Sequence, residues 1–127
     1  MRRTQAPALQ VLHSDIVYDF NWFPDMNSAS PDTCVFATTC GRDCIRLIDA
    51  YTGETRATYR AFDHLERMAS AHSLCFSPDG SRIYAGYERL IRIFWTSHPG
   101  TLCDEVPFYG TTVCLSCDSR RLTSFFR

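Results

Sequence analysis

Lysine is absent from this 127-residue sequence, and all thirteen basic residues other than histidine are arginine. The formal net charge of −1 argues against a broad, non-specific grip on nucleic acid, although it leaves room for a local basic patch. Arginine suits bidentate contacts with phosphate groups. A bias in genomic base composition is the simpler explanation for the missing lysine, so composition alone does not indicate a nucleic-acid ligand.

Motifs typical of enzymes are also missing. The sequence contains no glycine-rich phosphate loop, no His-Glu-x-x-His and no Gly-x-Ser-x-Gly. We therefore predict no catalytic residues, no cofactor and no small-molecule substrate. A small hydrolase that pairs Asp63 with His64 and uses a serine or cysteine nucleophile remains an alternative. The sequence shows no signal peptide and no apolar run of membrane length, so we expect no membrane contact.

The seven cysteines indicate reduced thiols rather than disulfides, because their number is odd and no secretory signal accompanies them. Two close spacings, Cys40 with Cys44 and Cys114 with Cys117, raise the question of a zinc site. A structural zinc ion needs about four converging ligands. Cys75 and Cys114 fall at equivalent positions of a repeat, which is typical of small strand residues. We therefore predict no metal site.

The segment with the clearest sequence pattern is 71–86, which predicts a β-hairpin. Apolar residues of 71–76 and 83–85 form two extended runs, and Ser77-Pro78-Asp79-Gly80 lies between them. Proline presets φ at the first corner of such a turn, aspartate hydrogen-bonds the nearby backbone, and glycine accepts a positive φ. This hairpin resembles the first hairpin of a WD-repeat propeller blade.

Parts of this pattern recur along the chain. Val17, Phe20 and Trp22 are spaced like Ala71, Leu74 and Phe76, and residues 35–37 match 83–85 in our alignment. A third match, 113–122 with 74–83, has an offset near the propeller period of about 40–45 residues. Residues 45–48 and 91–94 predict third strands with Arg46 and Arg92 on the solvent side. Residues 55–59 and 105–109 predict fourth strands, and 62–69 predicts a short helical turn.

These repeats predict an all-β fold, a partial WD-repeat β-propeller with about two blades plus the first hairpin of a third. We divide the chain into a frayed segment at 1–12, blade-like repeats at 13–62 and 63–110, and the start of a third repeat or a divergent tail at 111–127. Because propellers need more blades than this, we expect the chain to be a fragment. A small all-β domain complete in itself is the alternative.

Arginine and tyrosine residues of loops and strand ends are candidate RNA contacts. Exposed aromatic rings can stack on unpaired bases while guanidinium groups contact phosphate. A solvated blade face with aromatic core residues explains the same pattern. The candidates are Arg42, Arg56, Arg60, Arg67, Arg89, Tyr51 and Tyr87.

Beyond the generic repeat, the chain resembles the telomerase Cajal body proteins, a family of WD-repeat proteins. The segments that carry the resemblance are 17–22, 27–33, 48–65 and 71–80, and the similarity extends over about residues 14–100. It implies a non-enzymatic scaffold of the nucleus and its Cajal bodies that supports telomere maintenance. The implied partners are small Cajal body RNAs, telomerase RNA, and ribonucleoprotein and telomerase subunits. A generic WD-repeat protein-interaction platform and an inactive truncated fragment are the alternatives.

Overall fold

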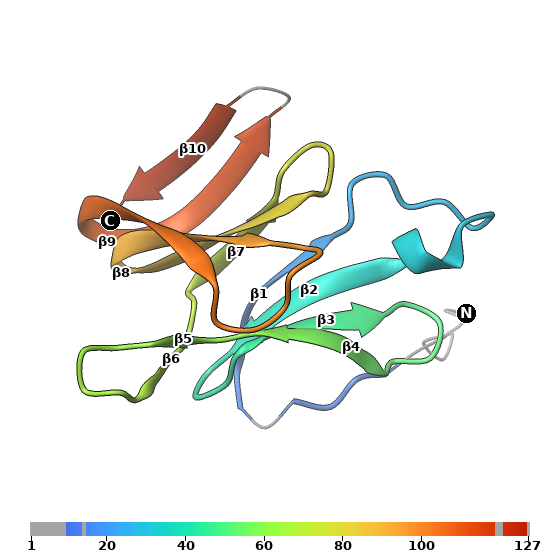
Figure 1. Ribbon diagram of the computed structural model, residues 1–127, viewed down its shortest axis with the longest axis horizontal. Helices are drawn as coiled ribbons and strands as arrows, with labels where there is room; N and C mark the ends of the chain where they lie inside the picture. The colour runs from blue at the N-terminus through green and yellow to red at the C-terminus, as the bar shows by residue number, and fades with distance from the viewer. Residues whose placement is uncertain (1–9, 14, 119–120, 127) are drawn as a thin grey trace, which may run out of the picture.

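The computed structural model describes residues 10–13, 15–118 and 121–126, with side chains up to residue 107, and it consists mainly of two antiparallel β-sheets (Figure 1). The first sheet has the strand order β1-β2-β3-β4, so each strand pairs with the next one along the chain. Its strands are β1 (Val17–Trp22), β2 (Val35–Cys40), β3 (Ile45–Asp49) and β4 (Thr55–Tyr59). A short 3-10 helix, η1 (Pro31–Thr33), lies between β1 and β2.

The second sheet follows in the order β10-β9-β8-β7. A small two-stranded sheet, formed by β5 and β6, connects the two larger ones (Figure 1). The strands are β5 (Ala61–Phe62), β6 (Met68–Ala69), β7 (Ser73–Phe76), β8 (Arg82–Trp95), β9 (Cys103–Asp118) and β10 (Arg121–Phe126). The hairpin predicted near the end of the chain corresponds to β9 and β10, which pair in an antiparallel manner.

Strand β8 folds back on itself. A straight strand of its 14 residues would span about 46 Å. The backbone N–H of Thr96 nevertheless donates to the carbonyl of Ser81 at 2.9 Å, so the two ends of β8 lie side by side. Arg89, with φ of 60°, lies at the reversal. The two strands predicted at 83–85 and 91–94 are therefore the two arms of β8.

The hydrophobic core lies between the two larger sheets. Tyr59 of β4 and Phe94 of β8 are fully buried and meet edge to face, with ring centroids 5.7 Å apart. Along the inner strands, Asp19 and Asn21 of β1 accept backbone N–H groups of β7 at 2.8 and 3.3 Å. The buried core consists of Val35, Ala37, Ile45, Leu47, Tyr59, Ala61, Ala71, Leu74, Phe76, Ile83, Ala85, Tyr87 and Phe94.

The structure confirms the hairpin predicted over 71–86. Strands β7 and β8 pair from Ser73 with Gly86 to Phe76 with Ile83. In the turn between them, Gly80 has φ of 76° and donates its N–H to the carbonyl of Ser77 at 2.8 Å. The fourth strand predicted at 55–59 is also confirmed, because β4 has these bounds.

The helical turn predicted for 62–69 is wrong, because this segment forms the β5–β6 hairpin. The Asp63 carboxylate accepts the backbone N–H groups of Leu65 and Arg67, at 2.9 and 3.0 Å, which closes a turn instead of starting a helix. Glu66 adopts φ of 59°, which a right-handed helix excludes. Leu65 and Met68 are exposed, so their helical spacing does not mark a buried face.

The match between residues 35–37 and 83–85 is wrong by one position. Phe23 donates its N–H to the carbonyl of Val35, and Ser77 donates in the same way to Arg82. Val35 is thus the counterpart of Arg82, and Phe36 is the counterpart of Ile83. The error arises in the long loop between β1 and β2, because the alternation of residues does not show where a strand resumes after a loop.

The predicted solvent position of Arg92 is also wrong. Only 8% of its side chain is exposed, and its guanidinium contacts the β5–β6 hairpin. Its counterpart in the first sheet, Arg46, is about one-third exposed and binds Asp43. Alternation along a strand identifies residues that share a face, but a neighbouring element decides whether that face is covered.

Candidate nucleic-acid interface

The seven candidate RNA contacts are divided between two ends of the molecule. One end carries the β2–β3 turn, the β5–β6 hairpin and the reversal of β8, and the opposite end carries η1 and the β3–β4 turn (Figure 1). Arg42, Arg60, Arg67, Arg89 and Tyr87 lie at the first end, which we call the hairpin end. Tyr51 and Arg56 lie at the other end.

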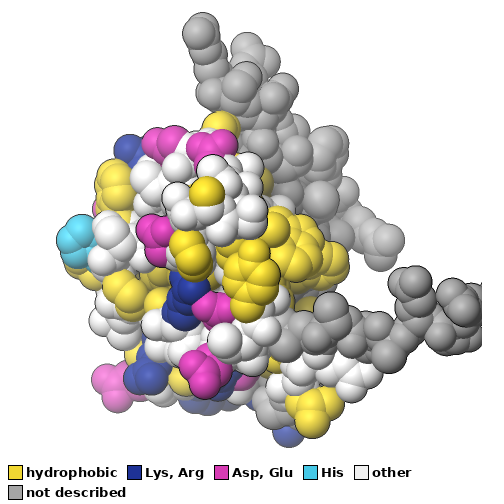
Figure 2. All heavy atoms as spheres, turned by 90° about the vertical axis from the view of Figure 1, so that its right-hand side faces the viewer, with side chains coloured by type: hydrophobic (Ala, Val, Ile, Leu, Met, Phe, Trp, Pro, Cys, Tyr) yellow, Lys and Arg dark blue, Asp and Glu magenta, His cyan; other side chains and the backbone are white. Residues whose placement is uncertain are grey.

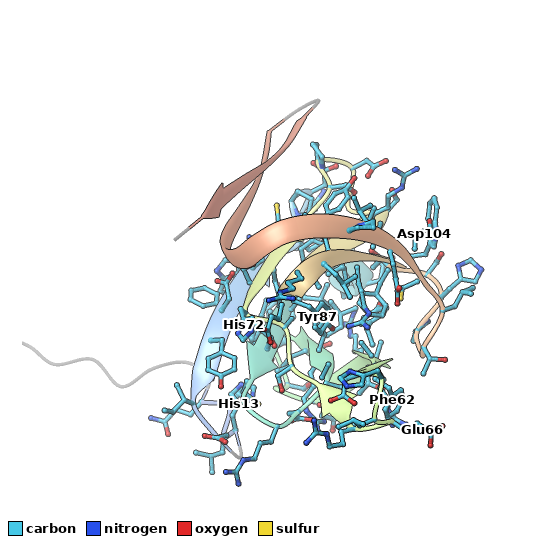
Figure 3. All side chains as sticks on the ribbon, turned by 90° about the vertical axis from the view of Figure 1, so that its left-hand side faces the viewer. His13, Phe62, Glu66, His72, Tyr87 and Asp104 are labelled. Atoms are coloured by element: carbon cyan, nitrogen blue, oxygen red, sulfur yellow. The ribbon has the colours of Figure 1, made fainter. Side chains whose placement is uncertain are left out.

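A groove of about 820 Å³ opens at the hairpin end. It lies between the β5–β6 hairpin, the residues that precede β7 and the reversal of β8. Figure 3 looks onto this end and labels His72 and Tyr87 near its centre, with Phe62 and Glu66 on the hairpin. The polar and aromatic lining residues are Tyr18, Phe62, Asp63, His64, Arg67, Ser70, His72, Tyr87, Glu88, Arg89 and Arg92.

Two arginines project from the rim of this groove. Arg67 is exposed and forms an ion pair with Asp63 at 3.2 Å. Arg89 is exposed at the β8 reversal and has no ion pair among the described side chains. Arg42 lies nearby on the β2–β3 turn, and the Ser70 hydroxyl, which donates to the Asp43 carbonyl at 3.4 Å, joins that turn to the hairpin segment.

Asp63 shapes the hairpin rather than pairing with His64. Backbone N–H groups of Arg67 and Leu65 hold the pKa of the Asp63 carboxyl below its usual range. The second carboxylate oxygen accepts from the Arg67 guanidinium, so both oxygens are occupied. The Asp63–His64 pair considered for a hydrolase is therefore a turn-capping aspartate beside an exposed histidine.

Arg92 is the functional candidate that the sequence reasoning missed. Its Nε donates to Glu105 Oε1 at 3.3 Å, and its Nη2 donates to the Phe62 carbonyl at 3.2 Å. The guanidinium lies 4.5 Å from the ring centre of Tyr87. Tyr87 is 3% exposed and burial raises its pKa, so its ring supports Arg92 and leaves no face for a base to stack on. No pattern in the sequence marks Arg92 as buried.

At the opposite end, which faces the viewer in Figure 2, the two remaining candidates contact neighbouring loops. Arg56 donates to the carbonyls of Pro31 and Asp32, at 3.1 and 3.0 Å, and forms an ion pair with Asp49. Backbone N–H groups of Thr52 and Tyr51 hold the pKa of the Asp49 carboxyl below its usual range. Tyr51 is exposed, with its hydroxyl 3.9 Å from the Cys34 sulfur. Neither Arg56 nor Tyr51 reaches the groove.

Metal-ligating side chains do not gather in the part of the chain with described side chains, where no three His, Cys, Asp or Glu residues could hold an ion together. Cys40 and Cys44 both contact the Asp43 carboxylate, with sulfur–oxygen distances of 3.6 and 3.5 Å. The side chains of Cys114 and Cys117 lie outside the described residues. No helix among the described residues has the length and apolar character needed to cross a membrane.

Comparison with curated proteins finds several similar sequences, although no protein-family model matches. Telomerase Cajal body protein 1 from Bos taurus is 46% identical over 99 residues, which cover 78% of this chain and 18% of that protein. A Drosophila melanogaster homologue of that protein is 43% identical over 100 residues, with 79% and 18% covered. Guanine nucleotide-binding protein negative regulator 1 from Schizosaccharomyces pombe is 32% identical over 80 residues, with 63% and 20% covered.

Solved structures share the fold. The WD40 β-propeller domain of Doa1 superposes with a TM-score of 0.62 at 21% identity, covering 85% of this chain and 32% of that one. The β-propeller domain of Cps50 (Swd1) from Myceliophteria thermophila gives a TM-score of 0.66 at 10% identity, covering 93% and 33%. At these identities the likeness concerns the fold alone. It confirms the predicted fold class, a partial WD-repeat β-propeller.

Proposed function

We propose that this chain is part of a non-enzymatic scaffold for RNA. The premise is that it is a WD-repeat segment related to telomerase Cajal body protein 1. The RNAs are small Cajal body RNAs and telomerase RNA, and the scaffold directs them to Cajal bodies of the nucleus. Ribonucleoprotein and telomerase subunits are its protein partners, and telomere maintenance is the process it supports. The matched residues span about a fifth of each relative, so this activity is proposed for the longer protein.

The observation that carries the proposal is the groove at the hairpin end. Its lining includes three arginines, Arg67, Arg89 and Arg92, against two carboxylates, Asp63 and Glu88. The exposed rings of His64 and His72 lie beside them. RNA recognition commonly combines guanidinium contacts to phosphate with ring stacking on unpaired bases. The groove therefore offers both kinds of contact on one surface.

Within this proposal, Arg42, Arg60, Arg67 and Arg89 contact RNA phosphates along the hairpin end. Tyr87 acts through Arg92, and Tyr51 and Arg56 stabilise the opposite end. We also propose that residues 13–62 and 63–110 are successive blade units, that 111–127 begins a third, and that 1–12 precedes them as a separate segment.

Fluorescence anisotropy with a labelled small Cajal body RNA tests the proposal. We expect the chain to bind this RNA more tightly than a copy with a scrambled hairpin-loop sequence. Replacing Arg42, Arg67 and Arg89 together with glutamine should weaken binding and reduce the slope of log K against log salt by about 0.7 per lost phosphate contact. The control is Arg82→Gln, which removes an exposed arginine at the opposite end, where it covers Trp95.

Two results would contradict the proposal. If the scrambled RNA binds equally well, the arginines provide only general attraction. If the wild-type chain and a longer relative both fail to bind the RNA while they still bind protein partners, the protein-interaction platform is the better account. Near-UV circular dichroism of each variant shows whether the aromatic core is still packed.

A further inference from the structure

The charged side chains of the groove balance one another. Arg67 pairs with Asp63 at 3.2 Å, and Arg92 pairs with Glu105 at 3.3 Å. Arg89 lines the groove directly after an exposed glutamate. Matched charges give little preference for an ionic ligand, so the ligand that fits the inner surface of the groove is one with little charge of its own.

Aromatic rings form much of the remaining surface of the groove. Exposed rings line it from β1, from β5, from the β5–β6 turn and from the residue before β7. Tyr18 is 48% exposed and Phe62 is 45% exposed, and His64 and His72 are exposed as well. The ring centres of Tyr18 and His72 lie 5.8 Å apart, with an angle of 50° between the ring planes. These two residues are therefore neighbouring rings that solvent reaches.

A β-bulge in β1 brings Tyr18 to this position. In the pairing of β1 with β2, Tyr18 is the extra residue between Val17 and Asp19, which both have partners. Successive residues of a regular strand point to opposite faces. Tyr18 nevertheless contacts His72, and Asp19 accepts the Leu74 N–H at 2.8 Å, so both side chains reach the start of β7. Bulges commonly re-aim a side chain beside a functional site, and this one turns the Tyr18 ring towards the groove.

The backbone of His72 is held in place, while its ring remains open to a ligand. The His72 N–H donates to the Gly86 carbonyl at 2.7 Å, and the Thr39 hydroxyl donates to the Ala71 carbonyl at 2.8 Å. No described residue hydrogen-bonds to the His72 ring or to the Tyr18 hydroxyl. Both rings therefore keep the donors and acceptors of their edges for a ligand.

Arg42, which lies outside the groove, favours a nucleotide over a peptide as the occupant. Gly41 lies beside the Tyr18 hydroxyl, because a Cβ added to this glycine would be 3.1 Å from it. The next residue, Arg42, has 94% of its side chain exposed and a long ion pair, with Asp15 at 3.9 Å. Its guanidinium can contact the phosphate that a stacked nucleotide carries, whereas a proline or aromatic side chain of a peptide brings no such charge.

We infer that the rings of Tyr18 and His72 form a stacking site for one unpaired nucleobase. A nucleobase is flat and uncharged, and its edge carries hydrogen-bond donors and acceptors. It therefore matches a pair of exposed rings with open polar edges in a groove of balanced charge. The inference rests on the proposed function, because we assign the base to the bound RNA. The exposed arginines then supply attraction to the RNA, and the two rings fix the position of one nucleotide.

Nuclear magnetic resonance of the aromatic side chains tests the site in the unmodified chain. Titration with adenosine, a neutral nucleoside, should shift the ring signals of Tyr18 and His72 at constant pH. Tyr51, which is 60% exposed at the opposite end, provides the control, and its ring signals should not move. Ribose 5-phosphate at constant ionic strength should leave all three residues unchanged. The small Cajal body RNA should shift the Tyr18 and His72 signals and should compete with adenosine.

Matched variants provide the second measurement. Tyr18→Leu should weaken RNA binding about tenfold, because it removes one stacking contact with a base. The slope of log K against log salt should stay the same, since no phosphate contact is lost. His72→Ala should weaken binding to a similar extent, whereas His72→Phe keeps a ring and should bind within about twofold of the wild type. Tyr51→Leu should change neither the affinity nor the slope.

Folding of the variants is checked separately. Near-UV circular dichroism shows whether each variant keeps the packing of its aromatic core. If Tyr18→Leu unfolds, the adenosine titration of the unmodified chain decides whether the site exists.

The outcomes separate this inference from the proposed function. RNA binding that leaves the Tyr18 and His72 signals and the Tyr18→Leu affinity unchanged would overturn the site and leave the proposed function standing. Adenosine that shifts these signals in a chain that binds no RNA would support the site and contradict its RNA source. A proline-rich peptide that shifts them, when adenosine and RNA do not, would overturn the assignment to a nucleobase.

Discussion

The inner strands β1 and β7 hold large apolar residues at equivalent positions, yet they bury them very differently. Phe76 and Leu74 of β7 are 4% and 2% exposed, and both belong to the core between the sheets. Their counterparts in β1, Trp22 and Phe20, are 50% and 56% exposed and lie outside that core. In stacked repeats a residue is buried only where a neighbouring sheet covers its face. The type of residue alone therefore does not determine how much its side chain contributes to stability.

The same difference separates the two third-strand arginines. Arg46 keeps a local partner, Asp43, at 2.9 Å and stays partly exposed. Arg92 lies under the β5–β6 hairpin and contacts β5, β9 and, through Tyr87, the other arm of β8. Arg46 and Arg92 occupy the same position of the repeat, but the β5–β6 hairpin covers only Arg92. The inserted segment therefore makes the two positions different.

The largest expected effect comes from truncating the matched aromatic pair. Phe76→Ala should lower the free energy of unfolding by about 3–5 kcal/mol, because it leaves a cavity in the core. Trp22→Ala should cost about 1 kcal/mol or less, since half of this side chain already faces solvent and the rest packs mainly on Phe36. Urea unfolding followed by far-UV circular dichroism measures both. Equal losses would show that Trp22 is covered in solution.

Glycine positions extend the comparison to the turns. Gly80→Ala should destabilise the chain by about 1–3 kcal/mol, because φ is positive there. An added Cβ would also lie 2.4 Å from the Phe23 ring. Gly41→Ala in the first sheet should cost less than about 1 kcal/mol, since its nearest neighbours are the ends of the Asp15 and Tyr18 side chains. Thermal unfolding of the two variants tests this order, and the reverse order would contradict the turn geometry.

Tyr59 connects the two sheets, and its loss should have a moderate effect. Its hydroxyl donates to the Thr96 carbonyl at 2.6 Å, so Tyr59→Phe should cost about 0.5–1.5 kcal/mol. Burial raises the pKa of Tyr59 to about 12, above the unfolded value of about 10. The neutral hydroxyl therefore adds stability below about pH 10 that is lost as the pH rises towards 12. Urea midpoints at pH 9 to 12 should fall more steeply for the wild type than for Tyr59→Phe.

The smallest expected effect concerns Asp79 at low pH. Hydrogen bonds from the Ser77 and Ser81 hydroxyls and the Ser81 N–H lower the pKa of Asp79 to about 2, from about 3.9 in an unfolded chain. Stability from this carboxylate is present above about pH 4 and is lost as the pH falls towards 2. Asp79→Asn should flatten the pH dependence of the urea midpoint in that window. The control Asp25→Asn removes one carboxylate from the matching turn of the first sheet and measures the effect of losing a negative charge alone.

Local chemistry made part of this structure predictable. The turn at 77–80 and the strand at 55–59 could be predicted from their own residue types, and the structure confirms both. The helical turn predicted for 62–69 was wrong. Leu65 and Met68 have helical spacing, but Asp63 and Glu66 form a turn instead. The groove could not be predicted, since the burial of Arg92 depends on a hairpin thirty residues away in sequence. Among the seven candidate RNA contacts, Arg56 could not be recognised from the sequence as a residue that donates to the Pro31 carbonyl in η1.

The loop that follows β8 has a consequence for association between chains. Arg60 donates its N–H to the Gly100 carbonyl at 2.8 Å, and Gly100 returns its own N–H to Thr58 at 3.0 Å. This short parallel bridge beside Tyr59 occupies backbone groups at the outer edge of the first sheet. An unpaired edge strand is a template for intermolecular β-pairing and fibre growth. Gly100, with φ of 123°, thus helps to keep this edge from recruiting further chains.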